Sequence, residues 1–258
     1  MLRKYSNSRT HADNVKLGTL TALVAGMVNV ASLVIFLSFS SNVTGYFAIF
    51  ATEIVNGNYL QIFLVGSWIF LYLFGAAISN FMIINFSKKN TYLAHAIPIF
   101  LEIVCILTVG IYTNYFYQNT LLESELLLSL LLFAMGLQNG LTASISNFAV
   151  KTTHLTGAIT DLGVLLSMFT KKRFRQRKEL VEKATLISSI LFAYVIGGIL
   201  FAYLYKLIGF KMFFVIVGLL LIIVCYDWYK IGSLKWKLFK HKKLREVDVK
   251  LSQTNNAF

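Results

Sequence analysis

The ionisable residues inside the apolar stretches of this chain are the first candidates for chemistry. Charged groups in a membrane interior cost about 2.5–3.5 kcal/mol on insertion scales, so they are rare there and usually functional. Asp161 is the strongest candidate, because it lies four residues after Gly157 and seven after His154, on one face of a helix. Such a carboxylate can hold a cation or an amine, or carry a proton. The alternative is a structural aspartate that ties down a broken backbone by local hydrogen bonds.

Two glutamates are further candidates for proton or ion coupling. Glu102 follows His95 by seven residues, with the single proline of the chain, Pro98, between them. Because a proline can kink a helix and free a carbonyl group, we expect Glu102 either to carry a proton or to bond a neighbouring helix as a neutral side chain. Glu53 follows Gly45 by eight residues, and it either couples an ion or lies solvated near the outer interface.

The dipeptide Thr-Gly occurs twice, and each copy follows a Gly-x-x-Asn sequence whose glycine lies 18 to 20 residues before the threonine. In a membrane protein, glycine-broken polar segments at matching places in two halves point to a central binding site. The asparagines either line that site or bond neighbouring helices. The second copy should carry most of the chemistry, because a histidine and three threonines lie close to Asp161 there. The expected substrate-binding residues are Asn29, Thr44, Gly45, Asn139, Thr153, His154, Thr156, Gly157 and Thr160.

Long apolar runs must position these residues. Of 258 residues, 57% are hydrophobic and 14% are charged, against about 25% charged in a typical soluble domain. A membrane span needs about 20 apolar residues, and the first run is too long and lacks the cleavage site of a signal peptide. The composition therefore predicts an all-α integral membrane protein with six transmembrane helices. The six runs are roughly 17–39, 59–86, 92–113, 126–150, 184–206 and 211–229.

Basic loops alternate along this chain with loops that contain no lysine or arginine. Loops 40–58 and 114–125 contain neither residue, whereas both tails, the loop at Lys88 and the segment 171–178 are basic. By the positive-inside rule, both termini of this multi-pass protein lie in the cytoplasm, and the membrane is the inner or plasma membrane. We expect the basic loops to face anionic lipid headgroups, and no nucleic acid partner despite the net charge of +13.

Segments 40–57 and 152–170 are left over between the six runs. Each leaves 12 or 13 residues after its glycine, or about 18–20 Å of helix, which is short of the hydrocarbon core of ~30 Å. They are therefore predicted to be broken or re-entrant segments that enter from opposite faces of two inverted repeats. The competing interpretation makes both full spans, giving eight, and places Lys88 outside. The expected parts are an N-tail (1–16), two three-span repeats (17–113 and 126–229) and a basic C-tail (230–258).

The segment Met135–Gly163, MGLQNGLTASISNFAVKTTHLTGAITDLG, resembles the second-half signature of the YoaK family of bacterial membrane proteins, a family without an assigned function. The segment Phe36–Ile54, FLSFSSNVTGYFAIFATEI, is similar to the first-half counterpart. The resemblance covers roughly residues 15–230 and implies a bacterial multi-pass fold, but no activity. The chain has Tyr46 where the family often has Asn, and Asn29 where it often has an acid. The second departure weakens any scheme that needs a titrating acid there.

Enzyme signatures are absent from the sequence, which contains no HExxH, no G-x-S-x-G, no glycine-rich phosphate loop and no Cys/His metal spacing. We therefore expect no enzyme, no metal and no cofactor. The first hypothesis is a secondary transporter or exporter of a small molecule, coupled to protons through Asp161, Glu102 or Glu53. Helix N-termini at the breaks would favour an anionic group on the substrate. The alternative is a non-transporting scaffold or lipid-interacting subunit, and a homo-oligomer is compatible with both.

Overall fold

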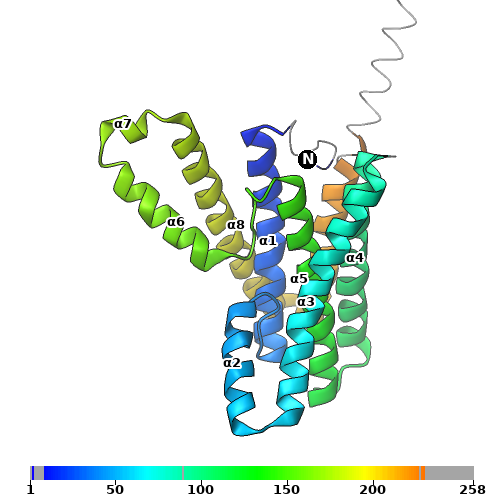
Figure 1. Cartoon of the computed structure of the whole chain (residues 1–258). Helices are drawn as coiled ribbons and strands as arrows, with labels where there is room; N and C mark the ends of the chain where they lie inside the picture. The colour runs from blue at the N-terminus through cyan, green and yellow to red at the C-terminus, as the bar shows by residue number, and fades with distance from the viewer. Residues whose placement is uncertain (1, 3–8, 89, 227, 230–258) are drawn as a thin grey trace, which may run out of the picture.

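The computed structural model describes residues 2, 9–88, 90–226 and 228–229, and within them the regular structure is entirely helical (Figure 1). The helices are α1 (His11–Phe36), α2 (Val43–Asn56), α3 (Tyr59–Phe86), α4 (Thr91–Tyr115), α5 (Leu121–Ile145), α6 (Leu155–Met168), α7 (Lys172–Arg175) and α8 (Lys178–Ile208), followed by a 3₁₀ turn (Gly209–Lys211) and a helix over residues 212–226.

Among the described residues, five segments are long and apolar enough to cross a membrane. They are α1, α3, α4, α5 and the 49-residue segment Lys178–Tyr226. The last is interrupted at Gly209, whose φ of 59° starts the 3₁₀ turn between α8 and the following helix. These segments confirm the predicted all-helical, membrane-embedded class.

Helix α3 has a largely exposed apolar surface, since only 22% of its most apolar 18-residue stretch is buried. Large apolar side chains on this helix point outward, including Phe63, Phe70, Leu73 and Phe81. An apolar surface of this extent is suited to a membrane or a partner and not to water.

The predicted element boundaries agree with the structure at α3 and differ at α5. The run predicted over 59–86 is α3 to the residue, and both Thr-Gly segments contain 14-residue helices, α2 and α6. The run predicted over 126–150 is wrong at its end, because α5 stops at Ile145. Asn147 and Phe148 then have φ of 52° and 61°, which a continuing helix cannot contain.

The helices α1 and α5 begin in the same way. The Thr10 hydroxyl oxygen accepts from the backbone N–H of Asp13, and the Asp13 carboxylate accepts from the backbone N–H of Thr10. Thr120 and Glu123 form the same capping box at α5. The two pairs are 110 positions apart in the sequence. The burial of the two helices matches as well. Each residue from 17 to 32 is buried or half-buried in the same way as the residue 110 positions later. The two helices thus present equivalent faces to the core.

Helix α1 packs closely along α8. A Cβ atom on Gly26 would lie 2.0 Å from the carbonyl oxygen of Tyr194, and one on Gly197 would lie 2.0 Å from that of Leu23. Both distances are far below any van der Waals contact, so the two backbones touch directly and only glycine fits at either position.

The same kind of contact joins α5 to α3. A Cβ atom on Gly136 would lie 2.2 Å from the carbonyl oxygen of Tyr72, and one on Gly75 would lie 2.4 Å from that of Phe133. In both helix pairs, the glycine of Gly-x-x-Asn meets a Tyr-x-x-Gly sequence on the facing helix. The core therefore contains two matching helix pairs, and α1 contacts α5 between them.

The helices α1 and α5 run in opposite directions. In Figure 1, the start of α1, the α3–α4 connection and α7 lie at the upper end, whereas the α2–α3 and α4–α5 connections lie at the lower end. The short helices α2 and α6 both begin near mid-height of the bundle, and α2 extends to the lower end while α6 extends to the upper end.

Candidate functional site

Asn139 organises the segment that precedes α6. Its side-chain oxygen accepts hydrogen bonds from the hydroxyl groups of Thr152 and Thr153, each at 3.1 Å. Thr153 also lies 3.3 Å from the hydroxyl oxygen of Tyr72 on α3, and the Asn139 amide donates to the carbonyl of Met135 at 2.8 Å. The cluster holds segment 146–154 against α5 and α3.

Asn29 has the same role before α2. Its side-chain oxygen accepts hydrogen bonds from Ser41 at 2.9 Å and from Ser40 at 3.4 Å. Tyr194 of α8 also bonds the Ser41 and Asn29 side chains. Hence each asparagine oxygen accepts from two consecutive hydroxyl residues, and the second of these hydroxyl groups, Ser41 or Thr153, also bonds a tyrosine of the helix that packs against the asparagine's own helix. This geometry favours the interpretation that the asparagines join protein segments, and their contact with a ligand stays a prediction.

The two Thr-Gly turns differ at their caps. Asn42 caps α2 by accepting a hydrogen bond from the backbone N–H of Gly45 at 3.2 Å, whereas His154, at the corresponding place before α6, makes no capping bond. The first-turn N–H groups of α6 therefore lack the side-chain partner that α2 has. Thr44 and Thr156 are both exposed.

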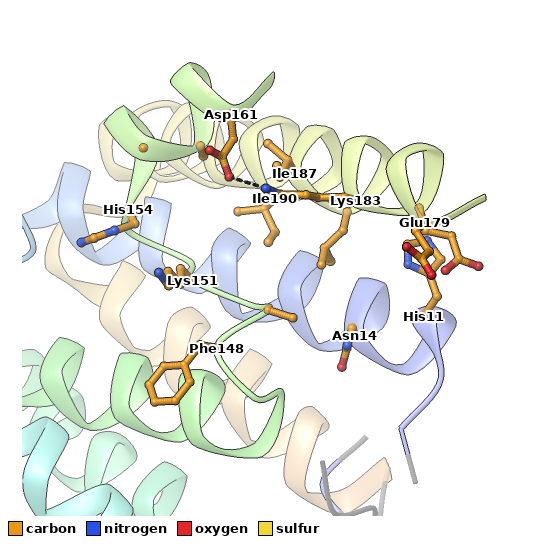
Figure 2. A pocket seen from close by; sticks show the side chains of 15 residues that line it. His11, Asn14, Phe148, Lys151, His154, Asp161, Glu179, Lys183, Ile187 and Ile190 are labelled. Atoms are coloured by element: carbon orange, nitrogen blue, oxygen red, sulfur yellow. Dashed lines mark ion pairs between the residues drawn. The ribbon is translucent and has the colours of Figure 1, made fainter. Parts of the chain in front are cut away.

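A pocket of about 620 Å³ lies between α6, α8, the start of α1 and segment 148–154 (Figure 2). Its central feature is an ion pair, in which the Lys183 ammonium of α8 lies 2.9 Å from a carboxylate oxygen of Asp161 on α6. Both side chains are about half exposed, at 54% and 52%. A carboxylate in this position can exchange its lysine partner for a proton, a cation or an amine.

The pocket unites only part of the predicted site. His154, Gly157 and Asp161 line it. Thr160 instead donates to the backbone carbonyl of Thr156 at 3.0 Å, and Thr153 belongs to the Asn139 cluster. The residues of the first copy, namely Asn29, Thr44 and Gly45, do not line this pocket.

Lys183 is a charged residue of the candidate site that the sequence did not single out. Its spacing from Asp161 carries no signal, because the two residues meet only through the hairpin that α6, α7 and α8 form. The lining also includes Lys151, Glu179 and His11, which were not singled out for the same reason.

Glu102 lies in the bundle core, outside the pocket. It is 0% exposed, and its Oε1 accepts a hydrogen bond from the Gln138 amide of α5 at 3.0 Å. Among the described residues, the second oxygen of Glu102 and the amide oxygen of Gln138 have no hydrogen-bond partner. Only a protonated carboxyl group can donate to another oxygen, so a neutral Glu102 would satisfy both atoms.

Glu53 is half exposed near the end of α2. Its backbone carbonyl accepts the N–H of Asn58 in the turn to α3. This position favours the interfacial interpretation of Glu53, and its role in ion coupling stays a prediction.

Within the part of the chain that the structure describes, no three His, Cys, Asp or Glu side chains are grouped so that they could hold a metal ion. Comparison with curated proteins and with solved structures found no match. A family model described as protein of unknown function (DUF1275) matches residues 17–226, from within α1 to the end of the helix over 212–226. The chain therefore belongs to the DUF1275 family.

Proposed function

We propose that the protein is not an enzyme but a secondary transporter or exporter of a small molecule, and that it belongs to the YoaK group. The observation that carries this proposal is the open, charged pocket around Asp161, beside a helix whose first turn is uncapped. A transporter needs a solvated polar cavity next to broken helices. In a static scaffold, the same groups would be dry and fully bonded to their neighbours.

The proposed architecture is two inverted repeats, each with three spans and one short helix. The matching caps, glycine contacts and asparagine clusters of α1 and α5 support the repeat, and the opposite directions of these helices support the inversion. The segment Lys178–Tyr226 would be about 74 Å long as one helix, more than twice a ~30 Å hydrocarbon core. We therefore count α8 and the helix over 212–226 as two separate crossings.

The proposed orientation places the upper end of Figure 1 in the cytoplasm. Lys88 and the basic segment 171–178 are at this end, whereas the α2–α3 and α4–α5 connections at the lower end contain no Lys or Arg. Lys211 is the exception, because the 3₁₀ turn Gly209–Lys211 packs beside the α4–α5 connection through Phe210 and Tyr117. Arg173 and Arg177 lie over the ring of Phe174, at 4.5 and 5.6 Å from its centre. This exposed cationic surface suits anionic lipid headgroups. The basic C-tail, predicted on the same side, lies outside the described residues.

The proposed coupling step is exchange at Asp161. When a proton or a substrate cation takes the place of the Lys183 ammonium, the ion pair between α6 and α8 is lost and α6 can move. Glu102 could supply a second proton site only if its carboxyl group changes charge during transport.

The second candidate function is a non-transporting scaffold or lipid-interacting subunit. One observation favours it, namely that Asn29 and Asn139 are bonded into the segments of the protein itself. In that case the Thr-Gly breaks are packing devices.

A deletion strain complemented with variants of this chain tests the proposal. Small-molecule levels inside and outside the cells are compared for the wild type, Asp161→Asn, Lys183→Met and a control, Lys178→Met. Lys178 is exposed, and its one ion pair within the described part of the chain is a surface pair with Glu182 at 3.8 Å. We expect the wild type and the control to restore the same compounds, and the two ion-pair variants to fail at equal membrane levels. Full activity of Asp161→Asn would exclude this coupling scheme, and no wild-type effect on any compound would exclude transport.

A further inference from the structure

One face of α8 forms a long wall of the pocket. The residues that line it recur every three or four positions, as one helical face requires. They change along the helix, from charged at Glu179 and Lys183 to apolar at Leu186, Ile187 and Ile190. From the first to the last, this wall extends about 16 Å. A ligand along it would meet charged groups at one end and aliphatic side chains at the other.

The charges that remain after internal pairing have opposite signs. Lys183 is neutralised by Asp161, and Glu182 has Lys178 nearby. Among the described residues, Lys151 and Glu179 have no ion-pair or hydrogen-bond partner for their side chains. The pocket thus keeps one cation and one anion for a ligand.

These two charges lie at different ends of the pocket. Figure 2 shows Lys151 beside His154 at one end and Glu179 beside His11 at the other, with the ion pair of Asp161 between them. A ligand with a single charge would be attracted to one of these two side chains and would leave the charge of the other without a partner. A ligand with both charges would satisfy both ends.

We propose that the pocket binds a zwitterion with apolar side chains, of the class of short peptides. The ligand carboxylate lies toward Lys151, its ammonium group lies toward Glu179, and its side chains contact Leu186, Ile187 and Ile190. A volume of about 620 Å³ is ample for such a molecule. The inference rests on the proposed function, since it names the substrate class of the same pocket.

Three matched probes test this inference on the purified full-length protein in detergent. They are dileucine, N-acetyl-dileucine, which lacks the ammonium group, and dileucine amide, which lacks the carboxylate. Calorimetric titration should show dileucine binding at least about tenfold more tightly than either blocked form, the factor that about 1.4 kcal/mol gives.

Two variants locate the charges. Lys151→Gln should abolish the preference for dileucine over its amide, and Glu179→Gln should abolish the preference over the N-acetyl form. Lys172→Gln on α7, outside the pocket, is the control and should keep both preferences. Circular dichroism and gel filtration of each variant exclude loss of folding as the cause.

Equal binding of the three probes, or no binding of any, overturns the inference. Unchanged preferences in the two pocket variants overturn it as well. If dileucine does not bind but Asp161→Asn still loses the effect of the wild type on cellular compounds, the inference fails and transport stands. If dileucine binds as expected and no compound changes in cells, the binding site stands and transport fails.

Discussion

The contact between α1 and α8 makes a demanding prediction for Gly26→Ala. The new Cβ atom would lie 2.0 Å from the Tyr194 carbonyl oxygen, whereas carbon–oxygen contacts between helices are about 3.3–3.6 Å. The two backbones must therefore separate by at least about 1.3 Å, because no rotamer change can move a carbonyl group. Overpacking of this kind costs about 1–3 kcal/mol, and it removes the close approach on which helix association in a membrane depends.

Thermal unfolding of the purified protein in detergent measures this effect. A loss of 1 kcal/mol lowers Tm by about 2–4 °C in a chain of this size, so Gly26→Ala should unfold about 2–12 °C below the wild type. Gly218→Ala, in the helix over 212–226, is the matched control, because a Cβ atom there meets no atom of the described residues within 4 Å. It should leave Tm unchanged or raise it, since alanine is the better helix former.

The counterpart Gly136→Ala extends the same test to α5. Its Cβ atom would lie 2.2 Å from the Tyr72 carbonyl oxygen, so its Tm should fall by a similar amount. If Gly26→Ala and Gly218→Ala unfold at the same temperature, the close α1–α8 contact is absent and the reasoning is wrong. If only one of the two counterparts destabilises the protein, the equivalence of the helix pairs is refuted.

Other predictions concern the polar contacts. Asn139→Leu leaves the hydroxyl groups of Thr152 and Thr153 without their acceptor, so it should lower the free energy of unfolding by about 1–3 kcal/mol. Proteolysis of segment 146–154 should become faster, and an unchanged rate would contradict the role of Asn139 in this cluster. Glu102→Gln should keep the wild-type Tm, because an amide can donate to the Gln138 oxygen. Glu102→Leu should lower the free energy of unfolding by about 1–3 kcal/mol. Equal losses in the two variants would argue against a neutral Glu102. A double-mutant cycle of Asp161 and Lys183 should give about 0.2–1 kcal/mol, declining in 1 M salt; a coupling that salt does not weaken would contradict a solvated pair.

The membrane helices could be predicted from the sequence because apolar runs are local signals. Their ends follow from caps that are also local, such as Thr10 with Asp13 and Thr120 with Glu123. The error at Ile145 arises because hydropathy continues past the point where the backbone of Asn147 leaves the helix. Two successive positive-φ residues there are set by the fold and not by composition.

The contacts between helices could not be predicted in the same way. Glu102 is a candidate in the sequence, but its pairing with Gln138 depends on how α4 packs against α5. Likewise, Lys183 reaches Asp161 only through the α6–α8 hairpin. One sequence pattern does indicate a contact of this kind. The hydroxyl pairs Ser40-Ser41 and Thr152-Thr153 stand at the same distance before the two Thr-Gly turns. Such matched hydroxyl pairs indicate acceptors that are also matched, and these are Asn29 and Asn139.

The accessibility of single cysteines tests the inverted repeat most directly. Cys105 and Cys225 are first replaced by alanine, and one cysteine is then introduced at Asn58, in the turn after α2, or at Thr170, just after α6. With three spans and a re-entrant helix in each repeat, a membrane-impermeant thiol reagent should label Asn58→Cys from outside intact cells and Thr170→Cys only after lysis. Labelling of both positions from the same side would mean that the short helices cross the membrane, and it would contradict the account.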